Sequence, residues 1–247
     1  MIRISRPTAV PAALAKANVQ QFITESAAYK ADPVNNPAPK RPTGYRNSDL
    51  LTAFDTYFHA KCYLTEEVFG SAWEMDVDHF EPVSHNPGRV LDWTNLYPTA
   101  HKANVMRGDQ YPPGGLLDPC SATDNVEFDI IYTLVEQGEK PGFHTRDPAN
   151  AKAVNTAQLL DELHNGKPHN AASNKSTRHL RYLIEKKYKM VLEAWGHYRS
   201  ALVGQDPQEI TETAEVLKRL LSRQTAFTML MRSLKFIRNT VPADWLA

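Results

Sequence analysis

The sequence lacks several features that would define its class at once. It has two cysteines in 247 residues, Cys62 and Cys120, so no disulfide framework is indicated. No uninterrupted apolar run approaches the ~20 residues that span a bilayer. The first residues also lack the continuous apolar segment of a secretory signal. We therefore expect a soluble, cytoplasmic protein that does not associate with membranes.

The chain also lacks net charge, because 28 Lys and Arg balance 28 Asp and Glu. A neutral chain generates no overall field that would attract a polyanion. The charge is unevenly distributed, however: residues 148–247 carry a net charge of +6, and residues 1–147 carry −6. This asymmetry is compatible with a binding face or a partner contact, and equally with an ordinary solvated surface.

Hydrophobic periodicity predicts an α-rich α+β protein with a small strand, loop, strand and helix unit in its middle. Asn47 or Ser48 is expected to cap a helix over 49–62, and Gly108 to stop a helix that opens near Pro98 and Thr99. Strands are expected at 73–78 and 93–97, and a strand pair at 126–134 and 142–145. Further helices are expected at 12–30, at 148–165 with Asp147 as its cap, and at 177–202, 206–222 and 224–238. We divide the chain into an N-terminal segment with a proline-rich linker (1–46), a core (47–147) and a helical C-terminal region (148–247).

The central unit carries a set of residues suited to phosphodiester hydrolysis. His79 can act as the general base, because the pKa of an unperturbed histidine lies near neutrality. Asp78 and the carbonyl oxygen of Asn104 are hard ligands that suit Mg²⁺ or Mn²⁺. Asn104 is the better placed of the two asparagines, because the helix after the second strand can face back across the hairpin. Asn95, on that strand, is better placed to pin the loop or to orient the His79 ring.

A regular strand raises a difficulty for this arrangement. Asp78 and His79 are adjacent, so on an extended strand their side chains point to opposite faces. They can converge on one phosphate only if the strand bends, which Pro82 would permit.

The segments "DVDHFEP", "WTNLYP" and "HKANVMRGD" resemble the three motifs of HNH endonucleases. The resemblance implies a ββα-metal core in which His79 is the general base, Asp78 and Asn104 bind the metal, and Asn95 is structural. His101, Lys102 and Arg107 are candidate contacts to substrate phosphate. Lys102 and Arg107 are equally interpretable as ordinary exposed helix residues, and His101 as a solvent-exposed side chain. The two Cys-x-x-Cys pairs of many HNH proteins are missing here, so we expect no structural zinc and a core held by packing of Trp73, Phe80 and Trp93.

Weaker similarities, such as "MIRISRP", "LLDPC" and "NTAQLLDELHN", resemble bacterial HNH proteins of ATPase-associated anti-phage systems such as Septu and its retron-associated relatives. This resemblance implies a nucleic acid substrate, DNA in preference to RNA, and an ATPase partner. The alternative is a subunit that mainly docks on such a partner and whose nuclease site is silent or licensed by it. The apolar stripe of Phe227, Leu230, Met231 and Leu234 is interpreted either as core or as the partner-facing surface.

Overall fold

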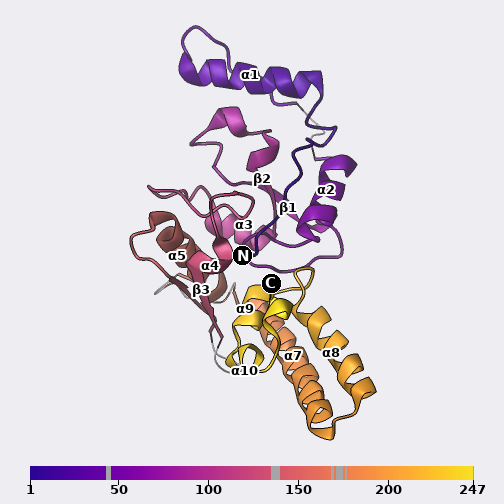
Figure 1. Cartoon of the computed structure of the whole chain (residues 1–247). Coiled ribbons are helices and arrows are strands. Elements are labelled where there is room, and N and C mark those ends of the chain that lie inside the picture. Colours follow the sequence, from indigo (N-terminus) through magenta and orange to yellow (C-terminus); the bar gives the residue numbers. More distant parts are fainter. Residues whose placement is uncertain (43–45, 135–139, 168–169, 171–174, 176, 247) are drawn as a thin grey trace.

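The computed structural model describes residues 1–42, 46–134, 140–167, 170, 175 and 177–246 (Figure 1). It is α+β and 51% helical, with two small two-stranded sheets, which confirms the predicted class. The described elements are α1 (Ala17–Ala31), α2 (Ser48–Phe58), β1 (Asp76–His79), β2 (Leu96–Thr99), α3 (His101–Arg107), α4 (Val126–Asp129), β3 (Ile130–Thr133), β4 (Gly142–Thr145), α5 (Ala151–Asn165), α7 (Arg178–Gly204), α8 (Pro207–Leu221), α9 (Thr228–Ser233) and α10 (Lys235–Arg238).

The predicted order of strand, loop, strand and helix is confirmed, but residues Trp93–Asn95 form a 3₁₀ turn, so Asn95 precedes the second strand, and Pro98 and Thr99 belong to that strand and not to the helix. Strands β1 and β2 pair antiparallel, with Asp76 opposite Thr99 and His79 opposite Leu96. Helix α3 begins directly after this hairpin and packs against β1. It ends at Gly108, whose φ of +51° lies in the left-handed region that favours glycine. The hairpin and α3 thus form one unit in the middle of the molecule (Figure 1).

The first strand begins later than the alternating pattern predicted. The Ser71 side chain accepts a hydrogen bond from the Trp73 backbone amide and caps a short 3₁₀ turn, Ala72–Glu74. Because this turn precedes β1, the Trp73 side chain is 57% exposed, and its predicted role in the core is wrong. Phe80 and Trp93 are buried as predicted.

Other boundaries also moved, mostly where a local cap or break competes with the apolar period. The helix expected to be capped by Asp147 starts later, because the side chain of Asn150 accepts a hydrogen bond from the Ala153 amide and caps α5. The helix expected over 224–238 is split at Leu234 into α9 and α10. Residues Val126–Asp129 form the short helix α4 before β3. Asn47 caps α2 as predicted, by accepting a hydrogen bond from the Leu50 amide.

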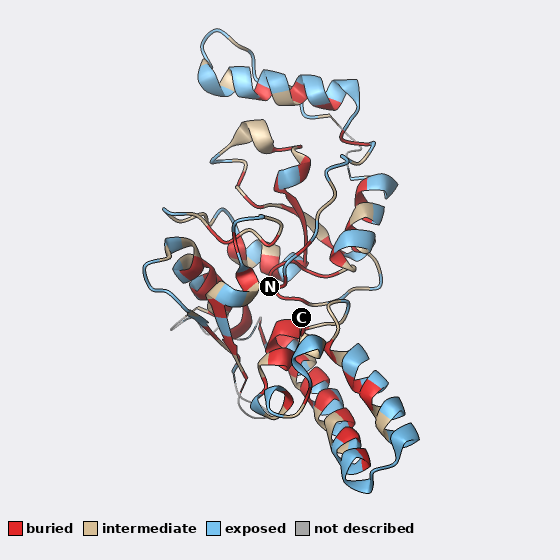
Figure 2. Ribbon diagram, in the orientation of Figure 1, coloured by how far each residue is buried: buried red, intermediate tan, exposed pale blue. Residues whose placement is uncertain are grey.

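The C-terminal helices form a hairpin, α7 and α8, that extends away from the hairpin–α3 unit (Figure 1). Its buried residues line the inner sides of the two helices, while the outer sides are exposed (Figure 2). The apolar stripe at 227–234 is part of the core, since Phe227, Leu230, Met231 and Leu234 are all buried. The alternative interpretation of this stripe as a partner-facing surface is therefore wrong.

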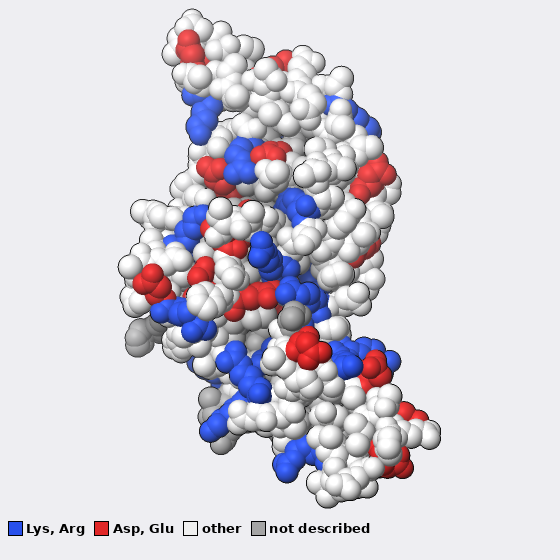
Figure 3. Space-filling view, in the orientation of Figure 1, with Lys and Arg blue, Asp and Glu red and all other residues white. Residues whose placement is uncertain are grey.

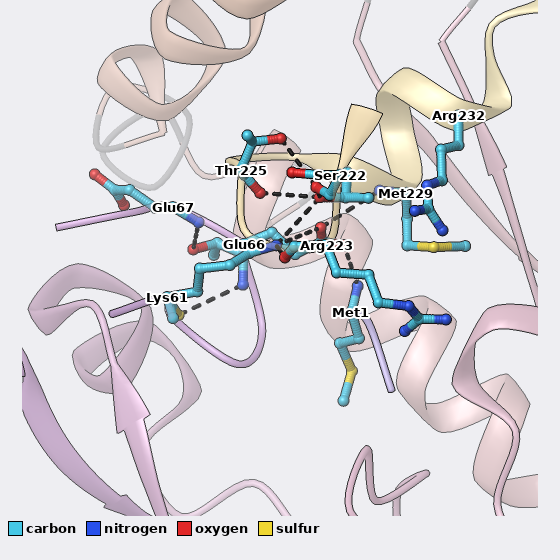
Figure 4. A network of polar contacts seen from close by, with 12 residues as sticks. Met1, Lys61, Glu66, Glu67, Ser222, Arg223, Thr225, Met229 and Arg232 are labelled. Carbon is cyan, nitrogen blue, oxygen red and sulfur yellow. Dashed lines mark hydrogen bonds and ion pairs between the residues drawn. The ribbon is translucent and has the colours of Figure 1, made fainter. Parts of the chain in front are cut away.

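A buried polar cluster links the loop after α2 to the C-terminal helices (Figure 4). The Glu66 carboxylate lies 3.0 Å from the Met1 amino group and 3.4 Å from Lys61 Nζ, and it accepts a hydrogen bond from the Met229 amide. Lys61 in turn donates to the Arg223 carbonyl oxygen at 3.0 Å. Burial by itself would raise the pKa of Glu66, but the positive charges of Met1 and Lys61 lower it to about 2. The Glu66 carboxylate is therefore ionised at neutral pH, and its contacts fix the loop that carries it.

Basic and acidic side chains are interspersed over the face shown in Figure 3. None of the helices in the described part of the chain is both long and apolar enough to cross a bilayer.

Candidate functional site

Strand β1 presents two carboxylates to α3. Asp76 and Asp78 are two residues apart on the strand, so their side chains share a face. Both contact α3: Asp76 contacts His101 and Asn104, and Asp78 contacts Arg107. The strand remains paired through His79, and the Phe80 amide continues the pattern by donating to the Asn95 carbonyl oxygen. Strand β1 therefore does not bend at Asp78 and His79, as the predicted convergence of these two side chains would require.

The Asp78 carboxylate lies in the core and is only 6% exposed. Its Oδ2 accepts hydrogen bonds from the Tyr63 hydroxyl at 2.8 Å and from Arg107 Nη1 at 2.6 Å, and neither contact uses Oδ1. Burial raises the pKa of Asp78, and the Arg107 charge offsets part of this effect. The arrangement ties the middle of β1 to the last turn of α3.

The position of Arg107 contradicts its predicted role as a phosphate contact or an exposed helix residue. Its side chain is 1% exposed, and its guanidinium also donates to the backbone carbonyl oxygens of His79 and Phe80. A buried group with these partners is neither an exposed helix residue nor a contact for substrate phosphate. Its role is to hold α3 on the end of β1.

Asp76 lies at the open end of the same face and was missed by the sequence interpretation. Its Oδ2 accepts a hydrogen bond from Asn104 Nδ2 at 3.0 Å and lies 2.9 Å from His101 Nδ1. Burial by itself would raise the pKa of Asp76, but the hydrogen bonds from Asn104 and His101 lower it. The signal was present in the sequence, because a residue two positions before Asp78 must share its face. The predicted ligand Asn104 therefore lies against Asp76, whereas Asp78 is engaged by Arg107.

The His79 ring lies in a half-buried position beneath the loop between the strands. Its Nε2 lies 2.8 Å from the Val90 carbonyl oxygen. A carbonyl oxygen can only accept, so Nε2 carries the hydrogen in this contact, and Nδ1 of the neutral ring is left as a proton acceptor. Burial lowers the pKa of His79, although the Val90 carbonyl counteracts it. The ring is consequently neutral near pH 7, as a general base must be.

Asn95 is buried in the loop between the strands, whereas the other two candidates, His101 and Lys102, lie at the surface. The Asn95 side chain is fully buried, donates to the Glu81 and Arg89 carbonyl oxygens and accepts from the Glu81 amide, so it holds both sides of the loop. His101 has a side chain that is 74% exposed, and Lys102 is also exposed. Both are accessible to a substrate from solvent.

The side chains on this face of β1 and α3 offer few ligands for a hard cation. Among the described residues, no group of three or more His, Cys, Asp or Glu side chains is arranged to hold a metal. Asp76 and His101 supply two such side chains, and Asn104, whose Nδ2 donates to Asp76, could add its amide oxygen as a third ligand. Such a small set fits Mg²⁺ or Mn²⁺, which keep several waters and take one or two carboxylates together with substrate phosphate.

Comparisons with protein-family models, with curated proteins and with solved structures find no match to this chain.

Proposed function

We propose that this chain is a metal-dependent endonuclease of the HNH type that hydrolyses phosphodiester bonds, with DNA as substrate in preference to RNA. The observation that carries the proposal is the contact between Asn104 on α3 and the Asp76 carboxylate on β1, on the strand that also bears the neutral His79 ring. One carboxylate, one amide and one proton acceptor thus come from a single hairpin and helix. The carboxylate and the amide lie on one face of β1 and the His79 ring on the other, so the mechanism requires β1 to bend at His79 when substrate binds.

The residues have distinct roles in this mechanism. His79 Nδ1 accepts a proton from water as the water oxygen bonds to phosphorus, the bond from phosphorus to the leaving sugar oxygen breaks, and that oxygen takes up a proton from solvent. When bound, a divalent cation stabilises the negative charge that develops on the phosphate and the leaving oxygen. Asn104 and Asp76 would hold it, with His101 beside them, and Lys102 would contact the substrate backbone.

Asp78 acts mainly as a positioning residue in this proposal. The resemblance to HNH endonucleases implies instead that Asp78 binds the metal, which its free Oδ1 would allow. The accessibility of Asp76 and its contact with Asn104 favour Asp76 as the ligand.

The hydrolytic activity is tested on supercoiled plasmid with Mg²⁺ or Mn²⁺, in parallel with single-stranded DNA and tRNA. His79→Ala is expected to slow cleavage by about 10²- to 10⁴-fold, the usual contribution of a general base. His85→Ala is the matched control, because His85 is an exposed histidine on the loop that follows β1. Equal cleavage by His79→Ala and the wild type would disprove the mechanism.

The ligand assignment is tested without cleavage, by titrating Mn²⁺ into folded protein and following its electron paramagnetic resonance signal. We expect Asp76→Asn to weaken Mn²⁺ binding at least about tenfold and Asp78→Asn to retain it in the fraction that folds. The opposite result would assign the metal to Asp78.

The role in anti-phage defence and the ATPase partner are further parts of the proposal, and they rest on the sequence resemblance alone. The alternative of a docking subunit loses its proposed surface, because the stripe at 227–234 is buried. Co-purification of the chain with the product of a neighbouring ATPase gene, from cells that express both, tests the partnership. The catalytically inactive His79→Ala chain should co-purify with the ATPase as well as the wild type does. If neither chain co-purifies, the proposed partnership is wrong.

A further inference from the structure

A cavity of about 330 Å³ lies beside the candidate site, between the loop after α2, helix α3 and the facing ends of α5 and α7. Ligand sites begin at roughly 300 Å³, so this cavity is large enough for a single small ring system. His101 lines it and also contacts Asp76, so the cavity and the Asp76–Asn104 contact are joined by one side chain.

The cavity is mostly apolar, with a few charged groups. Phe69, Ala103, Met106, Leu163 and Leu180 form much of its wall. A wall of this kind accommodates the face of a flat, weakly hydrated group and gives no place to a hydrated ion.

Two carboxylates line this wall: Glu74, which is exposed, and Glu67, which is half-buried. Its neighbour Glu66 turns into the buried cluster of Figure 4, whereas the Glu67 side chain points away from that cluster. Burial raises the pKa of Glu67, and the nearby His179 and Lys102 counteract this. The carboxylate disfavours a phosphate in the cavity, and the two basic neighbours disfavour a cationic ligand. A neutral ring with hydrogen-bond donors on one edge satisfies both constraints.

Nucleobases are neutral rings of this kind, and guanine matches a carboxylate best. Its Watson–Crick edge places two donors, N1–H and the 2-amino group, side by side, so that both carboxylate oxygens can accept. Adenine and cytosine present one amino group beside an acceptor nitrogen, which a carboxylate would repel. Proteins commonly read unstacked bases through this edge in pockets with apolar walls.

We propose that the cavity binds a guanine base of the nucleic acid strand, with Glu67 accepting hydrogen bonds from its Watson–Crick edge and Phe69 and Met106 packing against the ring. The inference deepens the proposed nuclease function and rests on it for the identity of the strand. The exposed Lys102 lies at the same wall, where it contacts the attached phosphate outside the cavity. The site would then prefer strands with guanine close to the phosphate at Asn104.

The test is binding of mononucleotides to the full chain in excess EDTA, so that neither cation binding nor cleavage contributes. GMP, AMP, CMP and UMP are titrated separately and followed by NMR chemical shifts of the protein. We expect GMP to bind at least about fivefold more tightly than the other three, the lower limit for a bidentate base contact. Equal affinities of GMP and AMP would overturn the proposal, and this comparison needs no variant.

Glu67→Gln replaces one acceptor oxygen by a donor amide and keeps the size of the side chain. It is expected to abolish the preference for GMP over AMP. Glu212→Gln on α8, an exposed residue outside this cavity, is the control and should keep that preference. A Glu67→Gln protein that still prefers GMP would overturn the role of Glu67.

The two proposals fail separately. Selective GMP binding without cleavage of any nucleic acid would retain the guanine site and reject the nuclease. Cleavage that depends on His79, together with equal binding of the four nucleotides, would retain the nuclease and reject the guanine site.

Discussion

The two carboxylates on β1 should differ sharply in their contribution to stability. Asp78→Asn leaves the Arg107 guanidinium buried at 1% exposure without its negative partner, which lay 2.6 Å away. Removing one member of a buried ion pair typically costs about 3–5 kcal/mol. Asp76→Asn removes a partly exposed carboxylate whose neighbour, His101, is mostly in solvent, and exposed pairs of this kind contribute about 0–1 kcal/mol.

Urea unfolding followed by tryptophan fluorescence measures both costs, and the chain has four tryptophans. In a chain of this size each kcal/mol corresponds to about 2–4 °C in the melting temperature. Asp78→Asn should therefore lower it by about 6–20 °C, and Asp76→Asn by less than about 4 °C. A loss below about 1 kcal/mol for Asp78→Asn would refute the reasoning, since Arg107 would then not depend on Asp78. Agreement would mean that lost activity in Asp78→Asn is no evidence for a metal ligand.

Three other predictions concern the body that supports the site. Burial lowers the pKa of His164 to about 4. As the pH falls, the unfolded chain therefore takes up a proton near pH 6.5, well before the folded chain does, and the free energy of unfolding should decrease by roughly 3 kcal/mol between pH 6.5 and 4. The pH dependence of His164→Gln stability should lack this decrease. Leu217→Ala should cost about 2–5 kcal/mol in urea unfolding, against less than about 0.5 kcal/mol for the exposed Val216→Ala. Asn95→Ala leaves the Glu81 amide without its side-chain acceptor and should cost about 1–3 kcal/mol of stability. Limited proteolysis should then cut the loop between β1 and β2 faster, and an unchanged rate of proteolysis there would contradict this role of Asn95.

Local signals predicted much of the fold. A side chain that caps its own helix, such as Asn47, and a glycine that ends one, such as Gly108, act within a few residues and can be recognised in the sequence. The error at Trp73 was also local: the Ser71 cap starts a 3₁₀ turn whose side chains resemble the alternation of a strand. Short apolar windows do not distinguish these two structures.

The placement of the site residues depended on tertiary structure and was less predictable. The sequence indicates that Asn104 faces back toward the first strand, but the carboxylate it meets depends on how α3 lies across β1. Arg107 determines this position, because its guanidinium binds Asp78 and two carbonyl oxygens at the end of β1. With the last turn of α3 fixed there, Asn104, one turn earlier, lies beside Asp76. No local pattern distinguishes a buried arginine of this kind from an exposed one.

This packing also gives an electrostatic reason for separating the two acids. A cation on Asp78 would lie close to the permanent positive charge of Arg107, and at a buried site such repulsion is only weakly screened. A cation on Asp76 has His101 as its nearest basic neighbour, and a neutral imidazole can act as a ligand there instead of repelling the metal. Asp78 thus neutralises the arginine that docks α3, which leaves the more accessible Asp76 for chemistry. The same strand can then serve both stability and function, because each acid has a different partner on one short helix.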